Sequence, residues 1–112
     1  MSLEAKQCVP CRGGIPPLSR SDAERLLSET PGWSLNEAAT AIERTFRFQD
    51  FAAALAFVDR VGALAEAEDH HPDITFGWGY CRVVFQTHKI KGLHENDFIM
   101  AAKVNRLAPE ST

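Results

Sequence analysis

Long apolar runs and runs of like charge are both missing from this sequence of 112 residues. No hydrophobic stretch approaches the roughly 20 residues that a membrane-spanning helix needs. Its 12 basic and 15 acidic residues are intermingled and leave a formal net charge of -3, so the surface has no basic stripe for phosphate groups. We therefore expect neither a nucleic acid nor a membrane as a partner.

Cysteine is scarce, and the opening residues MSLEAKQ lack the apolar segment of a secretion signal. Three cysteines are an odd number, which is typical of a reducing compartment, so we expect a cytoplasmic protein. Cys8 and Cys11 have the spacing of half a zinc knuckle or a redox pair, but no second pair completes four thiolates. Two free thiols on a mobile tail are the simpler interpretation.

The length of the chain fits one domain with a single core. Gly13, Gly14 and the prolines at 10, 16 and 17 crowd the first 18 residues, which have too little periodicity to pack. We predict a flexible arm over residues 1–18, one domain over residues 19–108 and a short tail over residues 109–112.

The rest of the chain alternates between helical and strand-like patterns. Ser21 and Asp22 can start a helix that stops at Pro31. Residues 33–35 and 41–48 alternate as two strands around a hairpin at 36–39, and residues 74–87 form two more strands that reverse at 78–80. We predict an α+β fold in the order α-β-β-α-β-β-α, a four-stranded antiparallel sheet with three helices on one face.

Two further helices complete this order. Asp50 can cap a long central helix that must end before Pro72. We expect the side of this helix that faces the core to be one apolar stripe, formed by Phe51, Leu55, Val58 and Ala65. Three neighbouring residues widen the stripe: Phe57, Val61 and Leu64. The last helix follows Gly92 and ends at Pro109, and its apolar positions, Met100, Val104 and Leu107, suit either core burial or an interhelical interface.

Three histidines are the candidates for chemistry. His70 and His71 follow three acids where the central helix gives way to an extended chain, and Pro72 restricts His71 to extended geometry. In the fourth strand, alternation sends Cys81, Val83, Phe85 and Thr87 to the core and His88 to the opposite face. Imidazoles exchange protons near neutrality, so two across one pocket could act as acid and base.

Simpler interpretations of the same residues stay open. Paired histidines at a helix end are often caps or surface residues, and three imidazoles can also hold zinc with an open position for water. Against zinc, adjacent histidines rarely reach one ion, and the i, i+4 helical pair is missing. Trp33, Trp78 and Tyr80 could stack on a planar heterocycle, although aromatic residues in strands are more often core or interface.

A wider constellation resembles the signature of the pterin-4a-carbinolamine dehydratases, with every spacing respected. It consists of Glu66, His70-His71-Pro72, Trp78, Thr87-His88, Gly92-Leu93 and Asp97. The resemblance extends from about Leu18 to Leu107. It implies a subunit with a four-stranded antiparallel sheet and three helices, built into homodimers or homotetramers.

The resemblance also implies a reaction, the loss of water from 4a-hydroxytetrahydropterin to give quinonoid dihydropterin, which recycles the tetrahydrobiopterin-type cofactor of aromatic amino acid hydroxylases. It implies no metal and no organic cofactor. His70 and His88 would be the acid-base pair, and His71 would bind and orient the pterin. A functional link to such a hydroxylase would follow.

Other site residues are implied in the same way. Thr87, Lys89 and Ile90 match a stretch that contacts substrate, and Pro72 belongs to the same binding set. Glu66, Asp97 and Trp33 would support the site, where a carboxylate can fix an imidazole tautomer.

One position departs from the family, because His94 replaces a serine that caps the last helix, which we expect to weaken the cap by about 1 kcal/mol. The alternative function is a non-catalytic scaffold, since relatives serve as a transcriptional dimerisation cofactor or assist Rubisco assembly. Such scaffolds can lose the histidines, whereas all three remain here.

Overall fold

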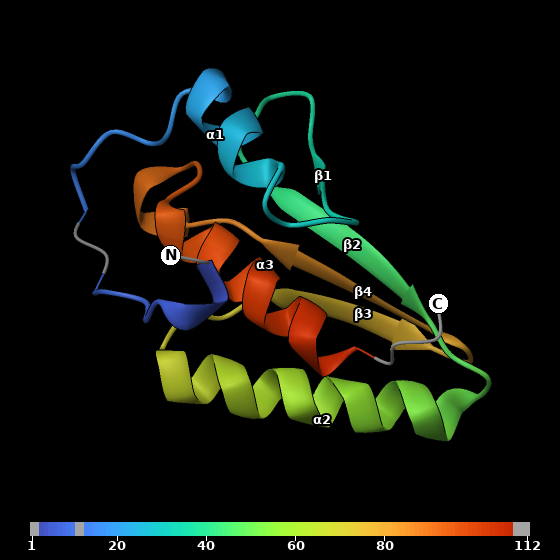
Figure 1. Cartoon of the computed structure of the whole chain (residues 1–112). Helices are drawn as coiled ribbons and strands as arrows, with labels where there is room; N and C mark the ends of the chain where they lie inside the picture. The colour runs from blue at the N-terminus through green and yellow to red at the C-terminus, as the bar shows by residue number, and fades with distance from the viewer. Residues whose placement is uncertain (1–2, 11–12, 109–112) are drawn as a thin grey trace.

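Three α-helices cover one face of a four-stranded antiparallel sheet in the computed structural model, which describes residues 3–10 and 13–108 (Figure 1). The strands lie in the order β1-β2-β4-β3. The elements are α1 (Arg20–Leu27), β1 (Ser34–Leu35), β2 (Ile42–Arg47), α2 (Phe51–Glu68), β3 (Asp73–Gly77), β4 (Tyr80–Phe85) and α3 (Glu95–Leu107). This arrangement confirms the predicted α+β class and element order. No helix in the described part of the chain is long and apolar enough to cross a membrane.

Side-chain caps fix where the helices begin. Asp50 caps α2 as predicted, its carboxylate accepting a hydrogen bond from the Ala53 backbone N–H at 2.8 Å. The start of α1 differs from the prediction, because Ser19 caps it and accepts from the Asp22 N–H at 3.1 Å. Ser21 and Asp22 instead lie inside the first turn.

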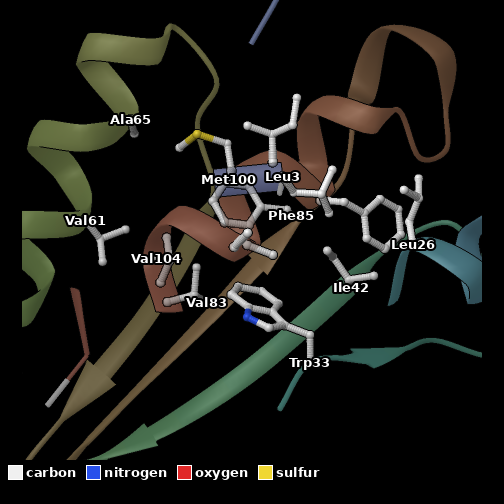
Figure 2. Close-up of a cluster of buried hydrophobic side chains, with 14 of the residues drawn as sticks. Leu3, Leu26, Trp33, Ile42, Val61, Ala65, Val83, Phe85, Met100 and Val104 are labelled. Carbon is white, nitrogen blue, oxygen red and sulfur yellow. The ribbon is translucent and has the colours of Figure 1, made fainter. Parts of the chain in front are cut away.

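The core lies between the sheet and α2 and α3. Figure 2 shows side chains of these elements meeting, among them Val61 and Ala65 from α2, Val83 and Phe85 from β4, and Met100 and Val104 from α3. The last two are fully buried. The interface considered for them is therefore wrong, and core burial accounts for both.

The buried stripe of α2 agrees with the predicted one in part, because Phe57, Val61 and Ala65 are buried as expected. Ala54, Phe57, Val61 and Ala65 face the core, whereas Phe51 and Leu55 are exposed. Ala54 is fully buried, and the exposed Phe51 packs on Phe76 of β3 with ring centroids 5.5 Å apart. Apolar residues surround most of this helix, so their spacing did not select one face.

The amino-terminal segment packs against the domain, contrary to the flexible arm expected from its composition. Residues Leu3–Ala5 form a 3₁₀ turn, and Leu3 is buried in the core. Figure 1 shows the segment running beside α3, where Lys6 pairs with Glu95 at 2.6 Å. The predicted tail, residues 109–112, and Cys11 lie outside the described residues.

Candidate active site

A cleft of about 290 Å³ lies where α2 gives way to β3 and where β4 leads into a short 3₁₀ turn, His88–Ile90. It brings the three candidate histidines together. Its lining residues are Val9, Pro10, Asp69, His70, His71, Gln86, Thr87, His88 and Lys89. The polar side chains come mainly from the ends of α2 and β4, which the sheet and helix packing hold side by side.

His70 is held by a buried carboxylate. Its side chain is 11% exposed, and its Nε2 lies 2.7 Å from Oδ1 of Asp97, which is 0% exposed. Oδ2 of Asp97 accepts hydrogen bonds from the Thr87 hydroxyl at 2.8 Å and the His94 backbone N–H at 3.0 Å. An ionised carboxylate accepts all three bonds, which places a hydrogen on Nε2 of His70 and leaves Nδ1 for a ligand.

The ring of His70 is also fixed by packing. It stacks on Phe85 with ring centroids 6.1 Å apart and an interplanar angle of 15°. The end of α2 sets its position: Asp69 has the left-handed φ of 54°, which turns the chain out of the helix, and the His70 N–H still reaches the Ala65 carbonyl at 3.2 Å. Sequence reasoning did not single out Asp69, which also lines the cleft.

His71 has a carboxylate partner of a different kind. Its Nε2 lies 2.5 Å from Oε2 of Glu66, but the two side chains are 52% and 78% exposed. Solvent on both sides screens such a pair, and it constrains the ring weakly. Glu66 itself does not line the cleft.

His88 reaches the cleft from a 3₁₀ turn and not from a strand face as predicted, because β4 ends at Phe85. Its side chain is exposed, and its Nδ1 lies 3.2 Å from the amide nitrogen of Gln86. With the amide as donor, Nδ1 accepts and Nε2 carries the hydrogen. Gln86 is a second lining residue that sequence reasoning missed.

The remaining predicted site residues divide into two groups. Thr87 and Lys89 line the cleft, whereas Pro72, Ile90 and Trp33 do not. Ile90 is buried, and Trp33 lies in the core, where its indole N–H donates to Asn105 at 2.8 Å. Trp78 and Tyr80, considered as stacking surfaces, are also absent from the lining.

His94 supplies the helix cap that we expected it to weaken. Its Nδ1 accepts a hydrogen bond from the Asn96 N–H at 2.9 Å, and Asp97 accepts from the His94 N–H. These contacts make a capping box at the start of α3. The carboxylate that holds His70 is therefore itself positioned by a helix cap.

The described residues contain no group of three or more His, Cys, Asp or Glu side chains arranged to hold a metal ion. Cys8 is free, and burial, with the charge of Glu68, raises the pKa of its thiol to about 12. A thiol at neutral pH is a poor metal ligand and nucleophile. The absence of a bound metal stays a prediction.

A known protein family matches most of this chain. The model of the family Pterin 4 alpha carbinolamine dehydratase matches residues 16–107. The chain belongs to this family. A protein of Methylococcus capsulatus that is named for pterin-4-alpha-carbinolamine dehydratase is 66% identical over 98% of this chain and 96% of its own. One from Cupriavidus pinatubonensis with the same name is 59% identical over 98% of this chain and 95% of its own.

Two solved structures of this dehydratase family share the fold. A transcriptional coactivator/pterin dehydratase from Brucella melitensis matches with a TM-score of 0.78 and 33% identity, over 83% of this chain and 99% of its own. A pterin dehydratase-like protein identified as a RuBisCO assembly factor in the alpha-carboxysome has a TM-score of 0.61 and 28% identity, over 71% of this chain and 93% of its own. The names of these two proteins therefore mention roles besides dehydration.

Proposed function

We propose that this protein is a dehydratase that converts 4a-hydroxytetrahydropterin to quinonoid dihydropterin and water. The observation that carries the proposal is the cleft in which His70, His71 and His88 meet, with His70 held by the buried Asp97. Membership of a family named for this reaction supports it.

The reaction needs one proton donor and one proton acceptor. The C4a–O bond breaks while the hydroxyl takes a proton and leaves as water, and the N5–H bond gives up its proton. The electron pair of that N–H bond forms the C4a=N5 double bond, so nothing is oxidised or reduced. Positioned acids and bases accelerate such transfers by about 100- to 10,000-fold.

His70 suits the role of the base. Asp97 accepts the hydrogen of Nε2, which leaves the Nδ1 lone pair for the N5 proton, and the carboxylate then stabilises the imidazolium that forms. His88 suits the role of the acid. As an imidazolium it can donate its Nε2 hydrogen to the departing hydroxyl and become the neutral ring, and the Gln86 amide beside Nδ1 can turn its carbonyl oxygen to accept from Nδ1–H. Water returns the protons after each turnover.

His71 and the neighbouring polar groups would bind the substrate. His71 lines the cleft with its ring tied to the exposed Glu66, a contact that orients the imidazole without holding it rigidly. Lys89 adds a donor at the same edge, and Thr87, whose hydroxyl donates to Asp97, also lines it. The mechanism needs neither a metal nor an organic cofactor, because imidazoles perform both proton transfers.

The wider setting proposed for this activity is cytoplasmic. The protein would act as a homodimer or homotetramer and would serve an aromatic amino acid hydroxylase by regenerating its tetrahydrobiopterin-type cofactor. The catalytic domain would include the packed amino-terminal segment as well as residues 19–108.

The test is the rate at which 4a-hydroxytetrahydropterin disappears when it is generated by phenylalanine hydroxylase, with and without this protein. We expect clear acceleration by the wild type and loss of most of it in His88→Ala, which should fold normally because His88 is exposed. Near wild-type turnover by His88→Ala would remove His88 from the mechanism. No acceleration by folded wild-type protein would contradict the dehydratase proposal.

A non-catalytic scaffold is the second candidate. It is favoured by the solved relatives that are named as a transcriptional coactivator and as a RuBisCO assembly factor. Folded protein that binds a protein partner and leaves the dehydration rate unchanged would support it.

A further inference from the structure

We propose that Val9 and Pro10 form the wall of the cleft that contacts the C6–C7 edge of the pterin and its C6 substituent. They lie before the residues matched by the family model, in the segment that the sequence analysis treated as an unpacked arm. The inference rests on the proposed dehydratase function and adds the determinant of side-chain preference.

The position of this wall is fixed by a buried asparagine. The Asn96 side chain is almost fully buried and bonds the Val9 backbone twice: its Oδ1 accepts from the Val9 N–H at 3.1 Å, and its Nδ2 donates to the Val9 carbonyl at 2.7 Å. One residue earlier, the Cys8 N–H donates to Glu68 at 2.9 Å. These bonds tie the backbone of the segment to side chains of α2 and α3, so the segment is part of the built site.

The same turn of α3 positions the wall and the proposed base. Asn96 holds Val9, and the next residue, Asp97, holds His70. The wall and the imidazole of His70 therefore share one rigid support across the cleft. A ligand that reaches Nδ1 of His70 will meet the wall at a set distance.

The chemical character of the residues that line the cleft indicates which part of the pterin lies against Val9 and Pro10. Among the described residues around the cleft, Val9 and Pro10 alone have side chains without hydrogen-bonding atoms. The pyrimidine half of a pterin carries an amino group, an amide N–H and a carbonyl. Placing these polar groups against such a surface costs free energy, because they lose their hydrogen bonds to water. The C6–C7 edge consists of carbon, and C6 is bonded directly to N5, the atom whose proton His70 would take.

Val9 is therefore an apolar side chain kept at the cleft for a ligand. Its side chain remains 56% exposed although its backbone is bonded on both sides. Packing alone does not account for it, since it is not among the core residues. Covering it with a C6 substituent would remove apolar surface from water, which favours binding.

The experiment compares two substrates, 4a-hydroxytetrahydropterin with a 6-methyl group and with a 6-(1,2-dihydroxypropyl) group, in Val9→Ala, Val9→Trp and wild type. Ile15→Ala is the matched control, because Ile15 is an exposed β-branched residue of the same segment that does not line the cleft. We expect Val9→Ala to raise KM by about threefold to fivefold through lost apolar contact, with kcat within about twofold. Val9→Trp should shift kcat/KM at least about tenfold towards the methyl substrate by filling the cleft.

Each outcome decides the inference separately from the proposed function. Unchanged thermal unfolding of both Val9 variants, with the expected KM shifts, would support the wall. Variants that match Ile15→Ala on both substrates, while the wild type turns over, would overturn the wall and leave the dehydratase proposal intact. Equal loss of kcat on both substrates would also overturn it, since that result indicates a general effect on the site. A folded wild type without turnover would contradict both.

Discussion

His70 and His71 are neighbours in the chain and each meets a carboxylate, yet their surroundings are opposite. His70 is mostly buried and bonded to Asp97, which has two further donors on its other oxygen. His71 and Glu66 both lie in solvent. A short imidazole–carboxylate distance therefore does not give two histidines the same surroundings. What distinguishes the pair at His70 is the network that fixes the carboxylate and, through it, the tautomer.

The largest expected difference is in turnover. His70→Ala should lower kcat by about 100- to 10,000-fold, because it removes the base. His71→Ala should act mainly on KM, with kcat reduced by less than about tenfold, because in the proposed mechanism its ring binds the substrate and transfers no proton. Steady-state kinetics of the two variants measures the split. Equal losses of kcat would contradict the roles assigned from their surroundings.

The second largest expected difference is in the free energy of unfolding when Asp97 or Glu66 is replaced by its amide. Asp97→Asn keeps the shape but leaves one of three buried donors facing an amide N–H, so it should lower the free energy of unfolding by about 1–3 kcal/mol. Glu66→Gln should change it by less than about 0.5 kcal/mol, because the side chain is exposed. Urea unfolding at neutral pH compares them. Equal destabilisation would show that the burial of Asp97 does not matter to the fold.

The smallest expected effect concerns a third carboxylate, Glu68, whose contribution to the free energy of unfolding depends on pH. The Cys8 backbone N–H lowers the pKa of Glu68 below its ordinary value of 4.5, with Lys103 adding to the shift and burial opposing it. A carboxyl whose pKa is lower in the folded state stabilises above its unfolded pKa, and this stabilisation disappears as the pH falls through the folded value.

We therefore expect wild type to lose about 0.5 kcal/mol more stability than Glu68→Gln between pH 6 and pH 3. Urea unfolding at the two pH values provides the measurement. Glu68→Gln keeps the shape of the side chain and has no carboxyl to protonate, so it is the control for every other effect of the pH change on stability. Parallel losses in the two proteins would show that the contact between Glu68 and the amino-terminal segment contributes nothing measurable.

The sequence predicts most of the fold because its strands have one wet face. Alternation in β4 correctly assigns Cys81, Val83 and Phe85 to the core, and Asn36 closes the first hairpin through bonds to the Thr40 and Ala41 N–H groups. The orientation of α2 could not be predicted in this way, since apolar residues lie on several of its faces.

The site was only partly predictable for a different reason. The three histidines stand out by type and position, but the polar contact that fixes His70 joins it to Asp97, which is distant in the sequence. Hydrophobic periodicity carries no signal for such bonds. The contact of Val9 with Asn96 escaped detection likewise, because the backbone of Val9 and the side-chain amide of Asn96 make it.

The most direct test of the account is the dehydration rate of 4a-hydroxytetrahydropterin with wild type, Asp97→Asn and Glu66→Gln, measured side by side on protein shown to be folded. We predict that wild type and Glu66→Gln accelerate the reaction alike, and that Asp97→Asn loses about 100-fold or more in kcat because it no longer fixes the His70 tautomer. An Asp97→Asn rate within about threefold of wild type would contradict the central claim that the buried carboxylate makes His70 the base.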